Sequence, residues 1–375
     1  MTQAKRRLNV TNIVFLLGTL AIAAVGTPIY LLKVGLGWPE TLTFLGLWLV
    51  VGLSVTAGYH RLFSHRTYQA AWPVRLFFLV FGAGALENSV VNWSADHRIH
   101  HSHVDEERDP YNITKGFWWA HIGWIFFEAP QQIPRSVVRD LLDDPLVRWQ
   151  DKWYPFIGIG VALGIPLVVG LLTGNVIGCL LIGGVLRIVV SHHGTFFINS
   201  LCHMVGRRPY SKEHSARDSP VMAVLAFGEG YHNYHHSFPF DYRNGIKSWH
   251  FDPAKWMIWT LSRLGLATNL RRAADAAILK AKIEVQFEAA RERMEQVVEG
   301  ARVRHEDRLH EAYARVQEVI QDLLALQRGR QKKVEPGTEH LPIETRMGLA
   351  YRALEQALRE WKQALRQTKR LPVTA

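Results

Sequence analysis

Histidines are the residues of this chain whose types and spacing could do chemistry. The sequence has 18 of them, and two distant groups share the spacing H-x-x-H-H. These groups are His97, His100 and His101, and His232, His235 and His236. At about 100° per residue, positions i, i+3 and i+4 project from one side of a helix. We therefore expect each triplet to aim three imidazoles at one point.

A third group consists of His60 and His65, which are five residues apart. On an ideal helix this separation opens an angle of about 140° between the two side chains. The two imidazoles therefore converge only if the helix unwinds between them, and otherwise they serve different ions.

Eight imidazoles in three groups exceed the need of one zinc ion, which takes four ligands in structural sites and three plus water in catalytic ones. The pattern therefore predicts two metal ions. Nitrogen ligands suit Fe, Cu, Ni or Zn, and redox chemistry requires Fe or Cu. The alternative interpretation is that histidines anchor the chain at a membrane interface or satisfy polar neighbours. We expect that simpler structural role for His103, His121, His214 and His250, and solvated helix positions for His305, His310 and His340.

Apolar segments must position these groups. Residues 8–32 carry no formal charge and, at about 1.5 Å per residue, exceed the roughly 30 Å hydrocarbon core of a bilayer, whereas a cleaved signal peptide would be shorter. A second uncharged segment covers residues 41–59, and the run 153–186 is long enough for two passes. A turn at residues 173–175 divides that run, so we expect the remaining spans at 153–173 and 176–198. A shorter apolar run, residues 76–86, suits a helix lying at the interface.

Three side chains fall in or beside the fourth span. Arg187 would cost about 3 kcal/mol at the bilayer centre, so we expect it to face a partner or to lie off centre. Cys179 and Cys202 are the only cysteines and offer no disulfide framework, so they are interpreted as buried thiols.

The charge of the short loops sets the orientation, because Lys and Arg near membrane helices stay in the cytoplasm. Lys5, Arg6 and Arg7 place the N-terminus inside, and segments 60–150 and 204–270 are rich in Arg and Lys. Both hairpins then close outside, so both termini and all three histidine groups are cytoplasmic. The expected fold class is an all-α membrane protein: four transmembrane helices in two hairpins and a cytoplasmic helical cap, residues 60–150 and 204–270, that holds a dimetal site.

Composition predicts a second part after the membrane domain of residues 1–270. Residues 271–375 hold 21 basic and 16 acidic side chains, against 23 and 17 in the much longer first part. Apolar residues step by threes and fours from Ile283 to Ala301, from Leu309 to Leu326 and from Met347 to Leu365, with a Gly/Pro break at residues 329–342. These stripes predict two long amphipathic helices that pack as a hairpin or coiled coil. A homodimerisation arm, a dock for a redox partner and a self-packed hairpin remain open.

The flanks of the histidine groups carry a family resemblance. Residues 56–68, 96–101 with 109–110, and 228–242 resemble the three histidine boxes of the integral-membrane fatty acid desaturases, specifically the delta-9 acyl-CoA desaturase-like family. The match covers about residues 11–251. The segment Asn199–His203 resembles a further family motif. By this resemblance two iron ions are bound by nine histidines, His60, His65, His97, His100, His101, His203, His232, His235 and His236, and Asn199 holds a metal-bound water. His192 and His193 either orient these ligands or serve helix packing.

The resemblance implies O2-dependent removal of two hydrogens from an acyl chain, leaving a cis double bond at the delta-9 position. An unactivated C–H bond has no acidic proton, so reduced iron must supply the oxidant while the protein positions the chain and excludes water. The implied substrate contacts are Asn88, Trp93, Asp96, Thr195 and Phe196. Ala95 and the pair Glu128-Ala129 stand where animal members carry cations near CoA. The acyl carrier, whether CoA, a membrane lipid or acyl carrier protein, therefore stays open.

The electron donor is expected to be another protein. The sequence shows no flavin or dinucleotide fingerprint, no cysteine set for an iron-sulfur cluster and no haem-binding domain, so ferredoxin, rubredoxin or a cytochrome with an NAD(P)H reductase is implied. Two rival functions remain: a membrane di-iron hydroxylase of fatty acids or alkanes, and a histidine-rich metal transporter or sensor. The expected location is the cell membrane of a bacterium, with no nucleic-acid partner.

Overall fold

The computed structural model describes residues 7–128, 135–327 and 341–372. The chain forms two compact units: Met1–Arg207 with His214–Arg272, and Arg208–Glu213 with Ala273–Ala375. Helices dominate both units, and the one sheet among the described residues is a two-stranded antiparallel ribbon. The expectations for Lys5, Arg6, Ala129, His340 and the break at 329–340 lie outside the described residues, as does the side chain of Ala301.

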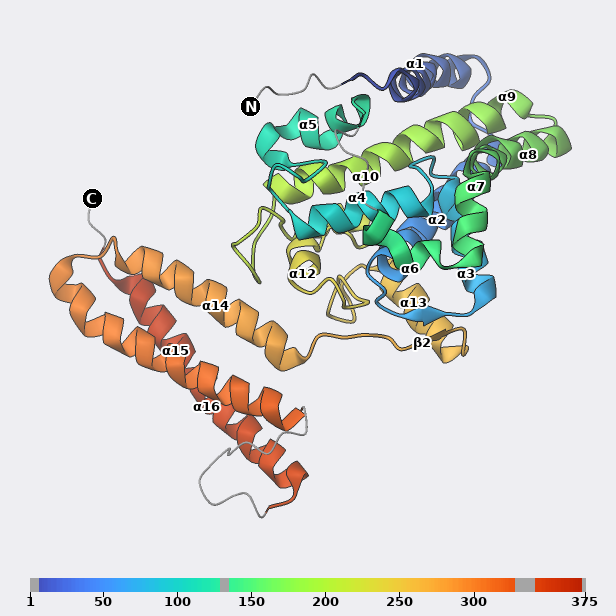
Figure 1. The fold of residues 1–375 in the computed structure, drawn as a ribbon. Coiled ribbons are helices and arrows are strands. Elements are labelled where there is room, and N and C mark those ends of the chain that lie inside the picture. The colour runs from blue at the N-terminus through green and yellow to red at the C-terminus, as the bar shows by residue number, and fades with distance from the viewer. Residues whose placement is uncertain (1–6, 129–134, 328–340, 373–375) are drawn as a thin grey trace. The chain divides into compact units, whose positions relative to one another are not determined.

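The first unit contains α1 to α13 together with π- and 3₁₀-helical segments (η) (Figure 1). Its first half comprises α1 (Val10–Lys33), α2 (Trp38–Leu53), η1 (Ser54–Ser64), β1 (Gln69–Ala70), α3 (Trp72–Ala83), α4 (Val90–Ser102), η2 (Ile113–Lys115), α5 (Phe117–His121), η3 (Gly123–Phe126), η4 (Arg135–Val138) and α6 (Arg139–Leu142). Its second half comprises α7 (Pro145–Ile159), η5 (Gly160–Gly164), α8 (Ile165–Thr173), α9 (Val176–Gly178), η6 (Cys179–Leu186), α10 (Arg187–Met204), α11 (Pro220–Leu225), α12 (His232–Ser237), α13 (Pro253–Arg263) and β2 (Ala267–Thr268).

Four continuous helices are long and apolar enough to cross a membrane: Val10–Lys33, Trp38–Ser64, Pro145–Thr173 and Val176–Met204. The prediction of an all-α membrane fold with four spans is confirmed. The helices extend past the expected spans, because the second helix continues beyond residue 59, the third begins before residue 153 and the fourth continues beyond residue 198. Loss of apolar character marks where a helix leaves the bilayer, whereas hydrogen bonding continues into the cap until a residue ends it.

The two transmembrane hairpins turn at the same end of the unit (Figure 1). Asn175, in the second turn, donates from Nδ2 to Glu40 Oε2 at 2.8 Å, and the Tyr30 hydroxyl donates to Glu40 Oε1 at 3.2 Å. Glu40 also accepts the backbone N–H of Gly37 at 2.6 Å. Gly174 adopts a left-handed φ of 74°, which glycine tolerates without steric cost. One buried carboxylate therefore joins the turns of both hairpins.

Arg187 does face a partner. Its side chain is fully buried and donates from Nη1 to the carbonyl oxygen of Gly84 at 2.8 Å. Gly84 follows directly after α3, the short apolar helix formed over the predicted interfacial run. Cys179 and Cys202 are both buried and free, as predicted.

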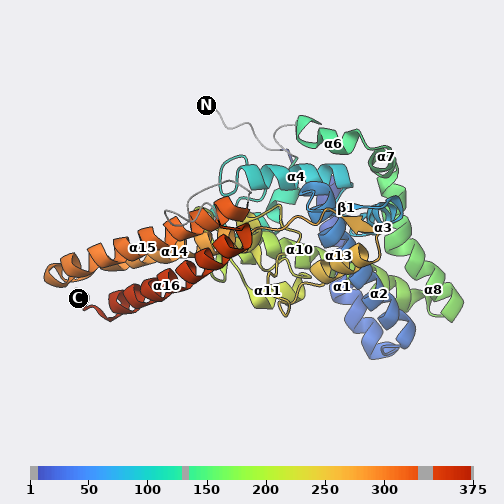
Figure 2. The same cartoon turned by 90° about the horizontal axis from the view of Figure 1, so that it is seen from below.

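A continuous apolar core joins one end of the spans to the cap. It includes Tyr59 and Leu62 of η1, Phe78 of α3, Val91 of α4 and Ile258 of α13. Figure 2 shows α1, α2 and α8 toward one end of this unit and α4 and α6 toward the other. The histidine-bearing elements are thus packed on the ends of the spans.

The second unit is a bundle of three helices, α14 (Asp275–Met294), α15 (Glu299–Gln327) and α16 (Ile343–Arg370), around a core of its own. The prediction of two long helices is wrong in number. The chain turns between Met294 and Glu299, yet Val297 within that turn is buried in the same core. The apolar periodicity therefore continues through the turn. No proline or glycine lies between Met294 and Glu299, so the sequence gives no local signal for this turn.

Candidate metal centre

The nine predicted histidines come from four separate parts of the first unit. His60 lies in η1 and His65 is the residue that caps it, α4 carries the first triplet, α10 carries His203, and α12 carries the second triplet. Their imidazole nitrogens form two clusters, in each of which the facing atoms lie within 4.8 Å of one another. One cluster contains His60, His65, His97, His101 and His235, and the other contains His100, His203, His232 and His236.

Each H-x-x-H-H triplet is divided between the two clusters, so the expectation of a single focus per triplet is wrong. His97 and His101 of α4 enter the five-histidine cluster while His100 enters the other. On α12 the pattern is reversed, because the i and i+4 positions enter the four-histidine cluster and His235 crosses to the first. Positions i and i+4 are nearly in line along a helix, whereas i+3 is displaced to the other side of that line. The two helices therefore exchange one histidine each between the clusters.

His60 and His65 enter the same cluster because the helix between them is unwound. Ser54–Ser64 is a π-helix, in which hydrogen bonds run from i to i+5 and neighbours five apart come onto one side. The backbone N–H of His65 donates to the carbonyl of His60 at 3.1 Å. Of the two alternatives that the spacing left open, the structure has the first.

Nε2 is the nitrogen that every one of these imidazoles presents to its cluster. The Nε2 atoms of His60 and His235 are 3.0 Å apart, those of His65 and His97 are 2.8 Å apart, and those of His203 and His232 are 3.0 Å apart. His101 and His235 are joined at 2.9 Å, and His236 lies 3.1 Å from His232 and 3.3 Å from His100. Two nitrogens bound at right angles to one ion at about 2.1 Å lie about 3 Å apart. The donor set and its spacing therefore fit one metal ion in each cluster.

The opposite ring nitrogen, Nδ1, has acidic or hydroxyl partners in four of the imidazoles, one of which is His97 with the Tyr111 hydroxyl at 3.4 Å. Glu229 lies 3.0 Å from His60 Nδ1, Asp109 lies 2.9 Å from His100 Nδ1, and the Ser215 hydroxyl lies 2.7 Å from His203 Nδ1. Such outer partners fix the tautomer of a ligating histidine and its ring orientation. The sequence did not predict a role for these partners, although Asp109 and Glu229 lie within the segments that resemble the histidine boxes.

Most of the cluster imidazoles outside the spanning helices favour the neutral form. Burial first, and then neighbouring imidazoles, lower the pKa of six of these, namely His65, His97, His101, His232, His235 and His236. Burial alone would raise the pKa of Glu229, but its contacts with His60 and Arg61 lower it to about 2. Neutral imidazole beside a fixed carboxylate is the form in which histidine binds a metal.

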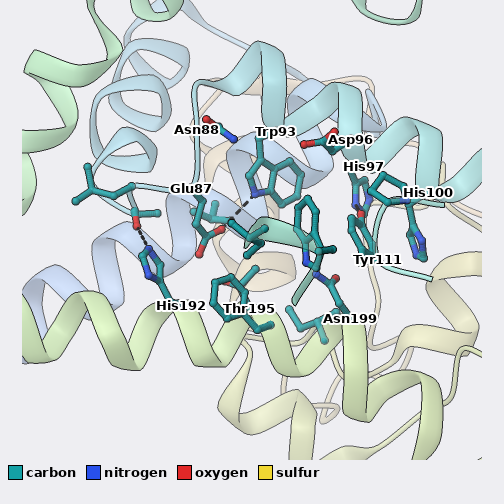
Figure 3. Close-up of a pocket in the computed structure, with 18 of the residues that line it drawn as sticks. Glu87, Asn88, Trp93, Asp96, His97, His100, Tyr111, His192, Thr195 and Asn199 are labelled. Carbon is teal, nitrogen blue, oxygen red and sulfur yellow. Dashed lines mark hydrogen bonds between the residues drawn. The ribbon is translucent and has the colours of Figure 1, made fainter. Parts of the chain in front are cut away.

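A cavity of about 1790 Å³ reaches both clusters. Its walls include His60, His97, His100 and His232, and α4 and α10 carry residues on facing sides (Figure 3). All five predicted substrate residues line it, namely Asn88, Trp93, Asp96, Thr195 and Phe196, and so does Asn199. Burial raises the pKa of Asp96 to about 7. The structure thus brings the predicted contacts together in one space, and their roles stay predictions.

Glu87 is a cavity residue that the sequence did not single out. It accepts a hydrogen bond from Trp93 Nε1 at 3.2 Å (Figure 3), and another from the Thr195 hydroxyl. Burial raises its pKa to about 7, although both hydrogen bonds and Arg187 oppose the shift. Trp93 in turn stacks on His97, with ring centres 5.1 Å apart. Glu87 therefore links two predicted substrate contacts to a cluster histidine.

The remaining histidines of this region have other partners. His192 Nε2 lies 2.8 Å from the carbonyl of Ala85, and His193 Nδ1 lies 2.9 Å from His121 Nε2. His121 also contacts the Ser200 hydroxyl at 3.1 Å. His192 therefore joins α10 to the segment after α3, and His193 joins it to α5, in keeping with the packing alternative, while His121 has the structural partners expected of it.

Comparison with known proteins gives one consistent result. A protein-family model described as fatty acid desaturase matches residues 37–269 of this chain. The chain is 46% identical over 235 residues to the probable acyl-CoA desaturase of Schizosaccharomyces pombe, covering 62% of this chain and 49% of that protein. It is 42% identical over 237 residues to acyl-CoA desaturase 1 of Saccharomyces cerevisiae, covering 63% and 46%. It is 38% identical over 274 residues to stearoyl-CoA desaturase 5 of Bos taurus, covering 71% and 80%.

The chain thus spans about half the length of the two yeast relatives and most of the bovine one. The model match covers more than half of this chain and contains all three histidine groups and His203. The chain belongs to the integral-membrane fatty acid desaturases, in the delta-9 acyl-CoA desaturase-like family.

Proposed function

We propose that this protein is an O2-dependent fatty acyl desaturase that introduces a cis double bond, at the delta-9 position, with two iron ions held by the nine clustered histidines. The observation that carries the proposal is the convergence of nine Nε2 atoms, in groups of five and four, at a cavity large enough for an acyl chain. Iron bound there would supply O2 reduction and the removal of hydrogen atoms from an unactivated chain.

The chain's own residues would bind and orient the substrate. The cavity runs from Asp96 and the cluster histidines to Trp48, Val51 and Gly52 on the second span. Trp48 precedes His60 by twelve positions, a helical distance of roughly 18 Å at 1.5 Å per residue. This apolar arm would hold the methyl end of the chain, while Trp93, Thr195 and Phe196 set the bend beside the clusters. Exclusion of water from this space would protect the oxidant from side reactions.

The outer carboxylates would keep the imidazoles in place. Glu229 bridges His60 and Arg61, with 3.1 Å between Oε1 and the guanidinium. Asp252 lies 2.9 Å from the same guanidinium. This buried network would hold the His60 Nδ1–H toward Glu229, so that Nε2 stays free to bind metal.

The partners follow from what the reaction needs. Each turnover consumes two electrons beyond those taken from the substrate, and we propose an external ferredoxin, rubredoxin or cytochrome with an NAD(P)H reductase as their source. The acyl chain would arrive on CoA, a membrane lipid or acyl carrier protein. Both termini and the clusters would face the cytoplasm of a bacterium, and the C-terminal bundle would be available for homodimerisation.

Expression with a redox donor in a host that lacks its own desaturase tests the proposal. New monounsaturated chains should appear in the total lipids, and their double-bond position should be delta-9 by mass spectrometry. Hydroxylated chains would instead identify a hydroxylase, and altered metal uptake with unchanged lipids would identify a transporter or sensor. A parallel culture expressing the His97→Ala variant should resemble the host alone.

A further inference from the structure

The cap carries an exposed aromatic surface that no part of the proposed reaction uses. We define this aromatic surface as Trp72, Trp256, Trp259, Leu264 and Leu266. Their side chains are 67%, 42%, 51%, 66% and 36% exposed, respectively. Large apolar side chains gathered on one surface mark a site of contact rather than ordinary surface variation.

Two elements bring these side chains together. Trp256 and Trp259 are three residues apart on α13 and lie on its outer side, opposite the buried Ala254 and Ile258. Leu264 and Leu266 follow at the end of α13, and the backbone N–H of Ala71 donates to the carbonyl of Leu266 at 2.9 Å. The adjoining pairing of β1 with β2 holds this connection in register. Trp72, the first residue of α3, is thereby fixed beside the end of α13.

The depth of the aromatic surface in the membrane follows from the core that packs behind α13. Ile258 and Ala254 pack in the same core as Ala57, Tyr59 and Leu62 of η1. A bilayer core of roughly 30 Å takes about 20 helical residues, so a span that begins at Trp38 leaves the hydrocarbon region near residue 58. The α13 helix, which packs on the second span, therefore lies at the depth of the lipid headgroups.

The polar groups at this surface fit the same environment. The guanidinium of Arg263 lies 5.3 Å from the ring centre of Trp259, and Lys247 Nζ lies 5.0 Å from that of Trp249. Tryptophan is enriched at the headgroup level, and long basic side chains extend from apolar surface to reach anionic headgroups.

We propose that the aromatic surface is a membrane-contact surface, which inserts into the headgroup layer of anionic phospholipids and anchors the cap to the bilayer. Asp252 caps the N-terminus of α13, and its carboxylate holds Arg61 next to His60. The anchor therefore acts on an element that also supports the metal centre, and it sets the depth of the clusters below the headgroups.

Site-specific labelling of the full-length protein in lipid nanodiscs tests this surface. Cys179 and Cys202 are buried, so a new exposed cysteine can be labelled selectively with an environment-sensitive fluorophore. Trp259→Cys and Leu264→Cys are the test variants, and the discs contain anionic lipids brominated near the headgroup end of the acyl chain. Leu42→Cys, at a position 60% exposed on the second span, reports full lipid contact. Glu106→Cys, at an exposed position in an acidic loop of the cap, reports the aqueous side.

The labels at 259 and 264 should lose fluorescence to bromine as strongly as the label at 42, while the label at 106 keeps its signal. Zwitterionic discs, or the added change Arg263→Gln, should weaken the loss at 264. If the labels at 259 and 264 keep their fluorescence as the label at 106 does, the proposal is overturned. The same holds if added ferredoxin then protects these two labels from the solvent, because the surface would then contact a protein rather than lipid. Leu264→Cys keeps every tryptophan, so the test stands even if Trp259→Cys fails to fold.

Discussion

The imidazole rings of His101 and His236 stack with their centres 4.2 Å apart and an angle of 11° between their planes, although they belong to different clusters. The five-histidine and four-histidine clusters are therefore in direct contact through these two rings. Two ions bound in them would be near neighbours, and a change in one cluster should be felt in the other. The proposed reaction accordingly depends on both clusters at once.

His100→Ala should abolish product and lower bound iron. The variant removes one of only four imidazoles from its cluster, so that ion should be lost and the iron-to-protein ratio should fall to about half of the wild-type value or below. Iron can be measured by elemental mass spectrometry alongside product lipids. His310→Ala, in the C-terminal bundle, should keep both. Full activity in the His100 variant would remove the metal assignment.

Glu229→Gln should weaken iron binding without removing an imidazole. The carboxylate contacts His60 and Arg61, and loss of such an outer partner typically costs about 10–100-fold in metal affinity or activity. Competition with a chelator at graded concentrations would measure the change. Glu311→Gln, at an exposed position on α15, is the matched control. Equal chelator resistance in both variants would contradict the role given to Glu229.

Phe227→Ala should extend the range of acyl chains that are desaturated. Phe227 lines the cavity beside Trp48, with ring centres 4.7 Å apart, and a side chain at Gly52 would begin only 2.4 Å from its ring. Removing the ring lengthens the apolar arm, whereas Gly52→Leu should shorten it. Product profiles from mixed chain lengths would show shifts in opposite directions. Val224→Ala, at an exposed position outside the cavity lining, should change neither.

Folding stability should fall as pH rises from about 4.5 to about 7 through the contribution of Glu87. Burial raises the pKa of this carboxyl from its usual 4.5 to about 7, so over that interval the folded protein retains a proton that the unfolded chain has released. A group bound more tightly to its proton in the folded state stabilises the fold at low pH and loses that effect as it ionises. Glu87→Gln should flatten this part of the melting-temperature profile in detergent. An unchanged slope would show that Glu87 does not titrate there.

Truncation after Arg271 should leave the metal centre intact. The C-terminal bundle has its own core, built from residues such as Phe287, Leu323 and Trp361. All nine clustered histidines precede the cut, and Arg271 itself still donates its N–H to the carbonyl of Thr67 at 2.8 Å. Purified truncated protein should carry the same iron as the full chain. Loss of iron would mean that the boundary between the two parts is misplaced.

Local pattern was enough to determine much of this protein. Charge-free length predicted four spans, because a bilayer demands about 20 apolar residues per helix wherever it is crossed. The repeated H-x-x-H-H spacing singled out the imidazoles, and the flanks of the boxes carried the resemblance to the family that the comparisons confirm. These features are readable because each depends on neighbours in sequence.

Tertiary structure decided how those parts meet. Periodicity could not show that α4 and α12 divide their triplets between two clusters, since that depends on how the two helices face each other. The π-helix that turns His65 toward His60, the link from Glu87 to Trp93, and the turn after Met294 all depend on contacts between distant segments or on burial of an unremarkable residue. The sequence by itself singled out the clustered histidines and the apolar spans, while packing alone determined which imidazoles share a cluster and what shape of cavity lies beside them.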